Sequence, residues 1–436
     1  MGDARKAALL VLEKCRRGGA WSDASLGSVM DSQRLEGRDR GLAAAIAYGV
    51  MQNRMLLDHV IAQASAIGIK DIEPKVLDIL RIAAYQILML DRIPAAAAVD
   101  SAVKLTKQTG CARASGFVNA VLRRVASQET PLPEGQDVET LSLRWSHPLW
   151  LTQLYMELLG TQEAAKLLQI DNDPVPITLQ TNTLRTDTDT LLAKLSDAGL
   201  CCRKHPHIPD CILLDSGAVQ RLPEFQNGEF YVQDAAAKMA VMAAQPRKGW
   251  KILDVCAAPG GKSFAAAICS GGADIVACDL HENKLRRIED SAKRLGLSGV
   301  TLRAQDAREF VPAFEGRFDL VIADVTCSGL GVIRKKPDIR YKDPAQFEAL
   351  PVIQTEILQN VSRYVKPGGT LLYSTCTIRP EENSEVCVGF LKEHPEFTYD
   401  DFVLPDGSAS RCGMLQLWPQ RNGTDGFFIA KMRRWN

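Results

Sequence analysis

The sequence lacks several features that would place it in a specialised class of protein. It has no run of about 18 uncharged apolar residues, which argues against a membrane-spanning helix. The apolar run near the N-terminus extends only from Ala7 to Leu12, too short for a secretory signal, so a cytoplasmic location is expected. None of the 12 cysteines forms a Cys-x-x-Cys pair, which argues against a disulfide scaffold and against a zinc or iron–sulfur site. We therefore expect neither a membrane nor a metal as a partner.

Two phosphate-binding fingerprints are also absent from the loop that follows an apolar stretch at 251–255. The loop has no Gly-x-Gly-x-x-Gly run, which disfavours a nicotinamide cofactor. Ala257 stands where the Gly-x-x-x-x-Gly-Lys-[ST] motif needs its first glycine, which disfavours a P-loop nucleotidase. Gly260 and Gly261 still allow a ligand to approach the backbone closely. Alone, this loop leaves a nucleoside ligand and an ordinary tight turn equally open.

The chain has no net charge, but its charge is unevenly distributed. Residues 1–130 carry a net charge of +5, and residues 131–250 carry −5. A basic first third suits nucleic-acid binding, although an ordinary solvated surface can have the same composition. Apolar residues in this part recur at helical spacing, as at Ile46, Val50 and Leu57, and predict a compact bundle of helices.

The remaining chain divides into a linker and two further parts. Residues 129–139 contain two prolines and a glycine and predict a linker. Residues 140–235 mix helical and strand-like segments and predict a small α+β module. From residue 236 strand, turn and helix alternate, which predicts a parallel, doubly wound α/β sheet. Its strands are expected at 250–255, 274–280, 300–304, 319–324 and 370–375.

Acidic residues follow the second and third of these strands, where such sheets bind their ligands. Asp279 could accept hydrogen bonds from ribose hydroxyls or could simply cap the next helix. Asp306 or a neighbouring residue could contact the edge of an adenine ring. Acidic residues at successive strand ends suit a ligand that carries ribose and adenine. Because the chain lacks a phosphate-binding loop, S-adenosylmethionine fits this pattern more readily than NAD or ATP.

Two cysteines, Cys327 and Cys376, follow the fourth and fifth strands and are therefore expected to lie close together. A single cysteine is more often a buried structural residue, but this pair stands beside Asp324 and Lys262. A thiolate is a strong nucleophile, and its addition to carbon 6 of cytosine would let carbon 5 attack a methyl sulfonium. Asp324 could hydrogen-bond the ring and Lys262 could help with charge, once the base is unstacked.

Residues 250–431 resemble the RNA cytosine-5 methyltransferase family. The similarity rests on the segments 254–262, 374–376, 334–340, 380–383 and 423–428. It implies that Cys376 is the nucleophile, that Cys327 is needed to release the product and that Asp324 and Lys262 assist catalysis. The residues implied to hold S-adenosylmethionine are Cys256, Ala257, Ala258, Pro259, Gly260, Gly261, Lys262, Asp279, Asp306 and Asp324.

The resemblance extends towards the N-terminus. Residues 1–128 are similar to the NusB-type RNA-binding domain, with a local match at Asn119–Arg123, and Phe225–Asp234 resembles the family segment that enters the catalytic domain. This combination implies a monomeric enzyme that methylates a cytosine of small-subunit ribosomal RNA. It also implies three domains, namely an all-α NusB-like bundle (1–130), a small α+β, RRM-like subdomain (140–235) and a Rossmann-like class I methyltransferase domain (236–436).

Two positions depart from the family pattern. Thr326 stands where the family has proline before the second cysteine, which predicts a freer loop, and Gln180 stands where the family usually has arginine, which predicts a weaker RNA contact. Two other functions stay open, namely the same chemistry on another RNA such as tRNA, and a catalytically weak RNA-binding or ribosome assembly factor. The N-terminal bundle argues against the first, and Cys376, Cys327 and Lys262 argue against the second. A DNA cytosine methyltransferase fits less well, because that family takes its nucleophile from the Pro-Cys position.

Overall fold

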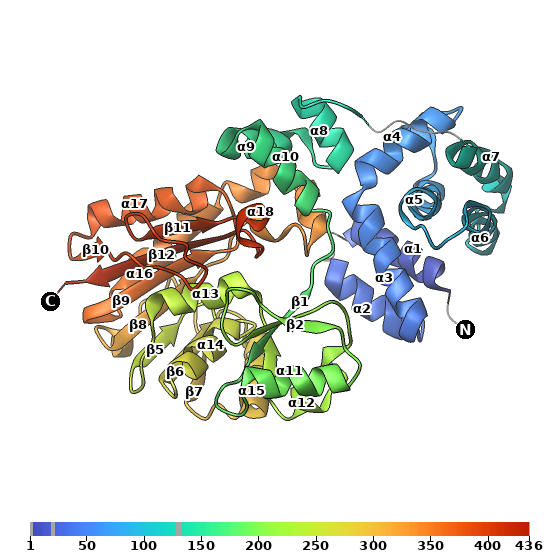
Figure 1. The fold of residues 1–436 in the computed structure, drawn as a ribbon. Helices are drawn as coiled ribbons and strands as arrows, with labels where there is room; N and C mark the ends of the chain where they lie inside the picture. The colour runs from blue at the N-terminus through green and yellow to red at the C-terminus, as the bar shows by residue number, and fades with distance from the viewer. Residues whose placement is uncertain (1–2, 19–21, 128–132, 436) are drawn as a thin grey trace. The chain divides into compact units, whose positions relative to one another are not determined.

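The computed structural model describes residues 3–18, 22–127 and 133–435 (Figure 1). The chain forms two compact units. The helical unit comprises Met1–Asp173 and Ile333–Lys342, and the sheet unit comprises Pro174–Val332 and Asp343–Asn436. Part of the predicted linker, residues 128–132, lies outside the described residues. In the described part of the chain, no helix is long and apolar enough to cross a membrane.

The helical unit confirms the predicted bundle. Its core contains the residues that recur at helical spacing, including Ile46, Leu57 and Leu80, all fully buried. Pro74 occupies the first turn of its helix, where a missing backbone N–H leaves no hydrogen bond unmade. The last three helices lie within the predicted α+β module but belong to this unit, so the three-part division stays a prediction. The helices are α1 (Ala4–Gly18), α2 (Ser22–Ser32), α3 (Gly37–Gln52), α4 (Arg54–Ala64), α5 (Pro74–Met89), α6 (Ala95–Gln108), α7 (Ser115–Ser127), α8 (Val138–Trp145), α9 (Leu149–Leu159) and α10 (Thr161–Ile170).

A segment from far along the chain, Ile333–Lys342, completes the helical unit. Its Arg340 is fully buried. The guanidinium donates through Nη1 to the carbonyl of Gln52 (3.1 Å) and to Oδ1 of Asn172 (2.9 Å), and through Nη2 to the carbonyl of Asp171 (3.3 Å). Buried carbonyl groups need hydrogen-bond donors, and Arg340 supplies them here. The arginine therefore belongs to the interior of the helical unit.

The sheet unit begins with a small antiparallel sheet in the order β2-β3-β1-β4. Leu179, Leu191 and Phe230 form its core. Strands and helices alternate here, as the mixed segments of this region predict, although β2 is only three residues long and carries no apolar alternation. The elements are β1 (Ile177–Thr181), α11 (Thr188–Asp197), β2 (Cys202–Lys204), β3 (Cys211–Leu214), α12 (Pro223–Gln226) and β4 (Phe230–Val232).

The large sheet has the order β10-β12-β9-β8-β5-β6-β7, with β11 paired to β12. Strands β9, β8, β5, β6 and β7 run parallel and confirm the predicted α/β alternation. The elements are α13 (Ala235–Ala244), β5 (Lys251–Asp254), α14 (Gly261–Cys269), β6 (Asp274–Asp279), α15 (Glu282–Leu295), β7 (Val300–Ala304), β8 (Phe318–Asp324), α16 (Leu350–Ser362), β9 (Val365–Thr375), α17 (Ser384–Glu393), β10 (Phe397–Tyr399), β11 (Met414–Leu417), α18 (Pro419–Asn422) and β12 (Phe427–Arg434).

The sheet also has an antiparallel edge, which lies beyond the five predicted parallel strands. Strand β12 runs antiparallel to β9, and β10 and β11 pair antiparallel with β12. The apolar run Phe427–Met432 is buried and reads as a strand, but its composition does not reveal the direction in which it pairs.

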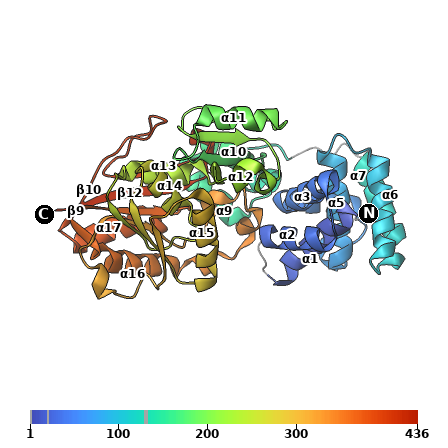
Figure 2. The same cartoon turned by 90° about the horizontal axis from the view of Figure 1, so that it is seen from below.

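Alternate residues of the parallel strands face two helical layers. Ile252 and Leu320 pack with α13, α14 and α15, whereas Leu253 and Val321 pack with α16 and α17. Figure 2 shows α13 and α14 on one side of the strands and α16 and α17 on the other. With both faces covered, the accessible chemistry of the sheet is concentrated at the ends of its strands.

Candidate functional site

The glycine-containing loop lies at the carboxyl end of β5, between that strand and the start of α14. The backbone N–H of Ala258 donates to Oδ2 of Asp279 at the end of β6 (3.3 Å), so two adjacent strand ends are joined. Gly260 adopts a φ of +105°, and a Cβ there would lie 2.5 Å from the ring of Phe264. Only glycine meets both constraints, which keeps the loop narrow and its backbone open to a ligand.

Asp254, the last residue of β5, is a buried acid beneath this loop. Its Oδ2 accepts a hydrogen bond from Oγ of Ser263 (2.7 Å), while Oδ1 has no partner. Burial raises the pKa of this carboxyl to about 7. The folded chain therefore favours the protonated form of Asp254 across the acidic range.

Replacing Asp254 by asparagine is expected to flatten the pH dependence of stability. The folded pKa lies above the unfolded one, so the stabilisation is full below about pH 4 and is lost as the pH rises to about 7. The shift corresponds to about 4 kcal/mol of unfolding free energy. Urea unfolding of both proteins between pH 5 and 8 measures the difference. Parallel stability curves would show that Asp254 does not titrate in this range.

The two acids predicted to hold a nucleoside occupy successive strand ends. Asp279 is buried and also accepts a hydrogen bond from the backbone N–H of His281 (3.0 Å). Asp306, beyond β7, accepts two hydrogen bonds from the guanidinium of Arg308 (3.1 and 2.7 Å), which lower the pKa of its carboxyl. Their contacts to ribose and adenine stay predictions.

Lys262 and Asp324 come together across the site. Lys262 is in the first turn of α14, and its Nζ donates to Oδ2 of Asp324 at the end of β8 (2.6 Å). The other carboxylate oxygen of Asp324 accepts a hydrogen bond from Oγ of Ser374 in β9 (2.8 Å). The ammonium also lies 5.0 Å from the ring centroid of Phe427. These contacts fix both charged groups, although the side chain of Asp324 remains 29% exposed.

Cys327 and Cys376 are in contact, as their places after β8 and β9 predict. Their Sγ atoms are 3.3 Å apart. The hydrogen bond between the two sulfur atoms lowers the pKa of the Cys376 thiol and raises that of Cys327. Thiolate character is therefore concentrated on Cys376, the residue predicted to be the nucleophile.

The chain before Cys327 is held without the family's proline. The side chain of Thr326 is exposed, but its carbonyl accepts a hydrogen bond from Nε2 of Gln354 (2.9 Å). The prediction of a freer loop is therefore not supported by the backbone contacts. The other departure also has a local explanation, because Gln180 is fully buried and donates to the carbonyl of Gln233 (3.0 Å). The expectation of a weaker RNA contact at this position stays a prediction.

Sequence reasoning missed several residues of the site. Ser374 lies in the matching segment 374–376 but had no predicted role, and no sequence pattern pointed to Gln354. Glu382 and Asn383 belong to the segment 380–383, which matched the family but had no predicted role. Both are buried and hydrogen-bonded beside the cysteine loops. For Glu382 and Asn383, the sequence signal was their place in a segment that matches the family, although no role had been predicted for that segment.

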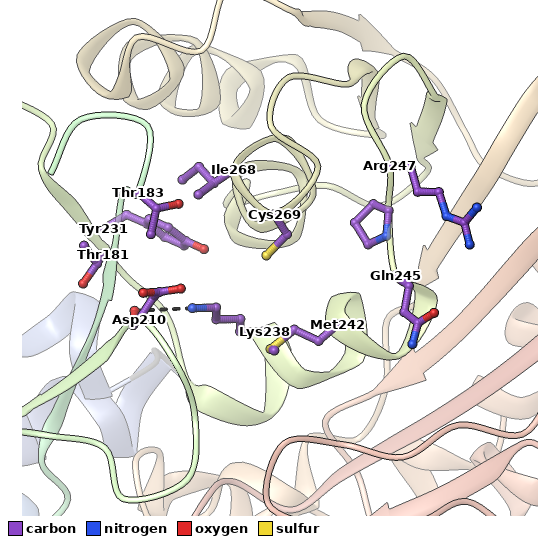
Figure 3. Close-up of a pocket in the computed structure, with 11 residues that line it drawn as sticks. Thr181, Thr183, Asp210, Tyr231, Lys238, Met242, Gln245, Arg247, Ile268 and Cys269 are labelled. Atoms are coloured by element: carbon purple, nitrogen blue, oxygen red, sulfur yellow. Dashed lines mark hydrogen bonds between the residues drawn. The ribbon is translucent and has the colours of Figure 1, made fainter. Parts of the chain in front are cut away.

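A pocket of about 480 Å³ lies elsewhere in the sheet unit (Figure 3). The buried Lys238 on its wall donates to the carbonyls of Pro209 (2.8 Å) and Asp210 (3.3 Å). The ends of α13 and α14 also line it, through Gln245 and Cys269. Helix C-termini favour a cation, which Lys238 already supplies, so the pocket has no evident charge preference for a ligand.

The Rossmann-like sheet, its glycine loop and the paired cysteines at adjacent strand ends define a class I methyltransferase. A family model described as 16S rRNA methyltransferase RsmB/F matches residues 241–433. A probable ribosomal RNA small subunit methyltransferase B of Bacillus subtilis is 36% identical over 440 residues, covering 99% of this chain and 98% of the relative. The chain therefore belongs to the RsmB/F family of ribosomal RNA methyltransferases.

Other comparisons agree with this assignment. Models of the NusB family and of a RsmF/B-like ferredoxin-like domain match residues 2–127 and 147–220. The ribosomal RNA small subunit methyltransferase B of Citrobacter koseri is 33% identical, with 92% of each chain covered. A crystal structure of the protein PH0851 superposes with a TM-score of 0.83 at 25% identity, covering 99% of both chains. The predicted NusB-like, small α+β and methyltransferase architectures are confirmed.

The cofactor of this methyltransferase family is S-adenosylmethionine, as the strand-end acids predicted. The residues present fit it, because the loop between β5 and α14 lies at a strand end and the Asp279 carboxylate, which accepts a hydrogen bond from Ala258 of that loop, stands at the next one. Over residues 3–18, 22–127 and 133–435, no group of three or more histidine, cysteine or acidic side chains could hold a metal ion.

Proposed function

We propose that this chain methylates carbon 5 of a cytosine in small-subunit ribosomal RNA through a covalent adduct of Cys376. The observation that carries the proposal is the 3.3 Å contact between Cys376 and Cys327, next to the Lys262–Asp324 ion pair. The names of the relatives support the RNA class.

Cys376 acts as the nucleophile in this proposal. Its thiolate forms a bond to carbon 6 of the cytosine, and the electron pair of the 5,6 double bond moves towards carbon 5. When bound, S-adenosylmethionine supplies the electrophilic methyl group. The residues that would hold it are Cys256, Ala257, Ala258, Pro259, Gly260, Gly261, Lys262, Asp279, Asp306 and Asp324.

The neighbouring groups act on the base and on its release. Asp324, fixed by Lys262 and Ser374, hydrogen-bonds the ring and orients it for attack. A base then removes the proton from carbon 5, the bond from carbon 6 to Cys376 breaks, and Cys327 is proposed to assist this release. The base must leave its stack to reach these groups, so the helical and small-sheet parts are proposed to bind the structured RNA around it.

Replacing Cys327 by alanine is expected to trap the covalent intermediate. Attack by Cys376 is retained, but release loses the thiol that assists it, so a complex of protein and RNA resistant to detergent should accumulate with labelled methyl groups. Gel electrophoresis of reactions with unmethylated small-subunit ribosomal RNA measures this complex, and nucleoside analysis of wild-type product identifies 5-methylcytosine. Normal turnover without an adduct would contradict the role of Cys327, and label only in transfer RNA would redirect the substrate assignment.

A further inference from the structure

We infer that Glu382 and Asn383 are positioning residues that hold the two thiols at their separation, each fixing the loop of one cysteine. They are consecutive, at the junction between a short 3₁₀-helix, Pro380–Glu382, and α17. The inference rests on the proposed function and extends it to residues without a chemical role in it.

The amide of Asn383 binds the chain on both sides of Cys376. Its Oδ1 accepts a hydrogen bond from Oγ1 of Thr375 (2.6 Å), and its Nδ2 donates to the carbonyl of Thr377 (3.1 Å). Nδ2 also donates to Oε1 of Gln416 (3.0 Å), so both amide hydrogens have acceptors. The side chain is 2% exposed, and water cannot readily replace these contacts.

Glu382 does the same for Cys327. Its Oε2 accepts hydrogen bonds from the backbone N–H of Ser328 (2.9 Å) and from Nε2 of Gln354 (3.0 Å). Gln354 in turn holds the carbonyl of Thr326, the residue before the cysteine. Glu382 is fully buried, and Nη1 of Arg379 lies 3.6 Å from its Oε1, which gives the carboxylate a counter-charge.

The sheet alone does not set the distance between the thiols. The β8–β9 ladder ends at the pair Asp324 and Ser374, before either cysteine. Beyond it the two loops are joined by a backbone bond from Gly331 to the carbonyl of Cys376 (3.0 Å) and by side-chain contacts. The backbone carbonyl of Glu382 also accepts a hydrogen bond from the hydroxyl of the buried Tyr373 (2.6 Å). Glu382 and Asn383 thus bind both cysteine loops from one place in the chain, the junction before α17.

The charge of Glu382 reinforces this arrangement. The charged groups that face the thiols are Lys262, Asp324, Glu382 and Asp425. The hydrogen bond to Cys376, burial and the Glu382 carboxylate all raise the pKa of the Cys327 thiol. These effects favour the proton on Cys327 and thiolate character on Cys376.

The test is the reactivity of Cys376 in the Asn383→Ala variant of the full chain. Alkylation by iodoacetamide is followed by peptide mass spectrometry as a function of pH, without RNA or cofactor. We expect the midpoint for Cys376 to rise by about one pH unit. We also expect kcat for methyl transfer to fall about 10–100-fold with an unchanged KM for RNA, because a small misplacement of reacting groups acts on this scale.

The matched control is Asn182→Ala. Asn182 is also fully buried and its amide donates to two carbonyls, of Gly228 and Leu295, away from the cysteines. This control is expected to keep the wild-type alkylation profile. Glu382→Gln retains an acceptor for the N–H of Ser328 and is expected to keep kcat closer to wild type than Glu382→Ala.

Should Asn383→Ala fail to fold, Thr375→Val removes the same 2.6 Å hydrogen bond with a side chain of equal size and is expected to raise the midpoint in the same way. An unchanged midpoint and kcat in the folded variant would overturn the inference. Because alkylation needs neither RNA nor cofactor, that result is distinct from failure of the proposed reaction, which appears in the RNA product.

Discussion

Replacing Cys376 by alanine is expected to abolish methyl transfer. The substitution removes the sulfur atom that attacks carbon 6 in the proposed reaction, and the neighbouring Cys327 is assigned to release and not to attack. The loss should be at least about 10⁴-fold in kcat, the scale on which removal of a covalent nucleophile acts. Transfer of labelled methyl groups to unmethylated small-subunit ribosomal RNA measures the loss.

Two further measurements distinguish the loss of the nucleophile from a loss of cofactor binding or from a general effect of replacing a cysteine. Binding of S-adenosylmethionine to the variant, measured by calorimetry, should match the wild type because Cys376 belongs to another loop. Cys269→Ala, which changes an exposed cysteine at the end of α14, should retain transfer. Turnover by the Cys376→Ala variant at the wild-type rate would falsify the assignment of the nucleophile.

Arg340→Ala is expected to destabilise the helical unit by about 4 kcal/mol. The substitution leaves a cavity and deprives the carbonyls of Gln52 and Asp171 of their donor, while the carbonyl of Ser146 keeps the hydroxyl of Tyr341. Oδ1 of Asn172 loses its donor as well. Buried acceptors without partners are costly, and several lost at once place this variant among the most damaging single substitutions. Thermal or urea unfolding measures the effect.

The matched control for this variant is Lys336→Ala in the same segment. Lys336 is exposed, so its truncation should change the unfolding free energy by less than about 0.5 kcal/mol. Equal stability of Arg340→Ala and the wild type would mean that the buried arginine contributes little to the unit.

The positions of the reacting groups could be predicted because they follow the ends of parallel strands. Asp324, Cys327 and Cys376 stand at or just after β8 and β9, and the register of a parallel sheet brings such residues together. Lys262 follows a glycine loop that starts a helix, a pattern equally visible in the sequence. The helical bundle was predictable for a similar reason, since its apolar residues recur at helical spacing.

Other features depend on contacts that no local pattern encodes. Glu382 and Asn383 bind backbone groups 54 and 6 residues away, and only the packed structure shows which groups lie within reach. Arg340 sits in a basic stretch that reads as a surface segment, yet its partners are carbonyls more than 150 residues earlier in the chain. The direction of β12 is likewise set by pairing, not by its apolar composition.

The inclusion of Ile333–Lys342 in the helical unit has a consequence for how the protein is made. Arg340 is synthesised about 170 residues after α10 ends. At the usual rate of about 5–20 residues per second, the ribosome needs roughly 10–30 s to add these residues. During this time the carbonyls of Asp171 and Gln52 lack Arg340, which donates hydrogen bonds to them in the finished fold. The N-terminal helices therefore reach their final stability only after about half of the predicted methyltransferase domain has been translated, and nascent chains should gain protease resistance in two stages.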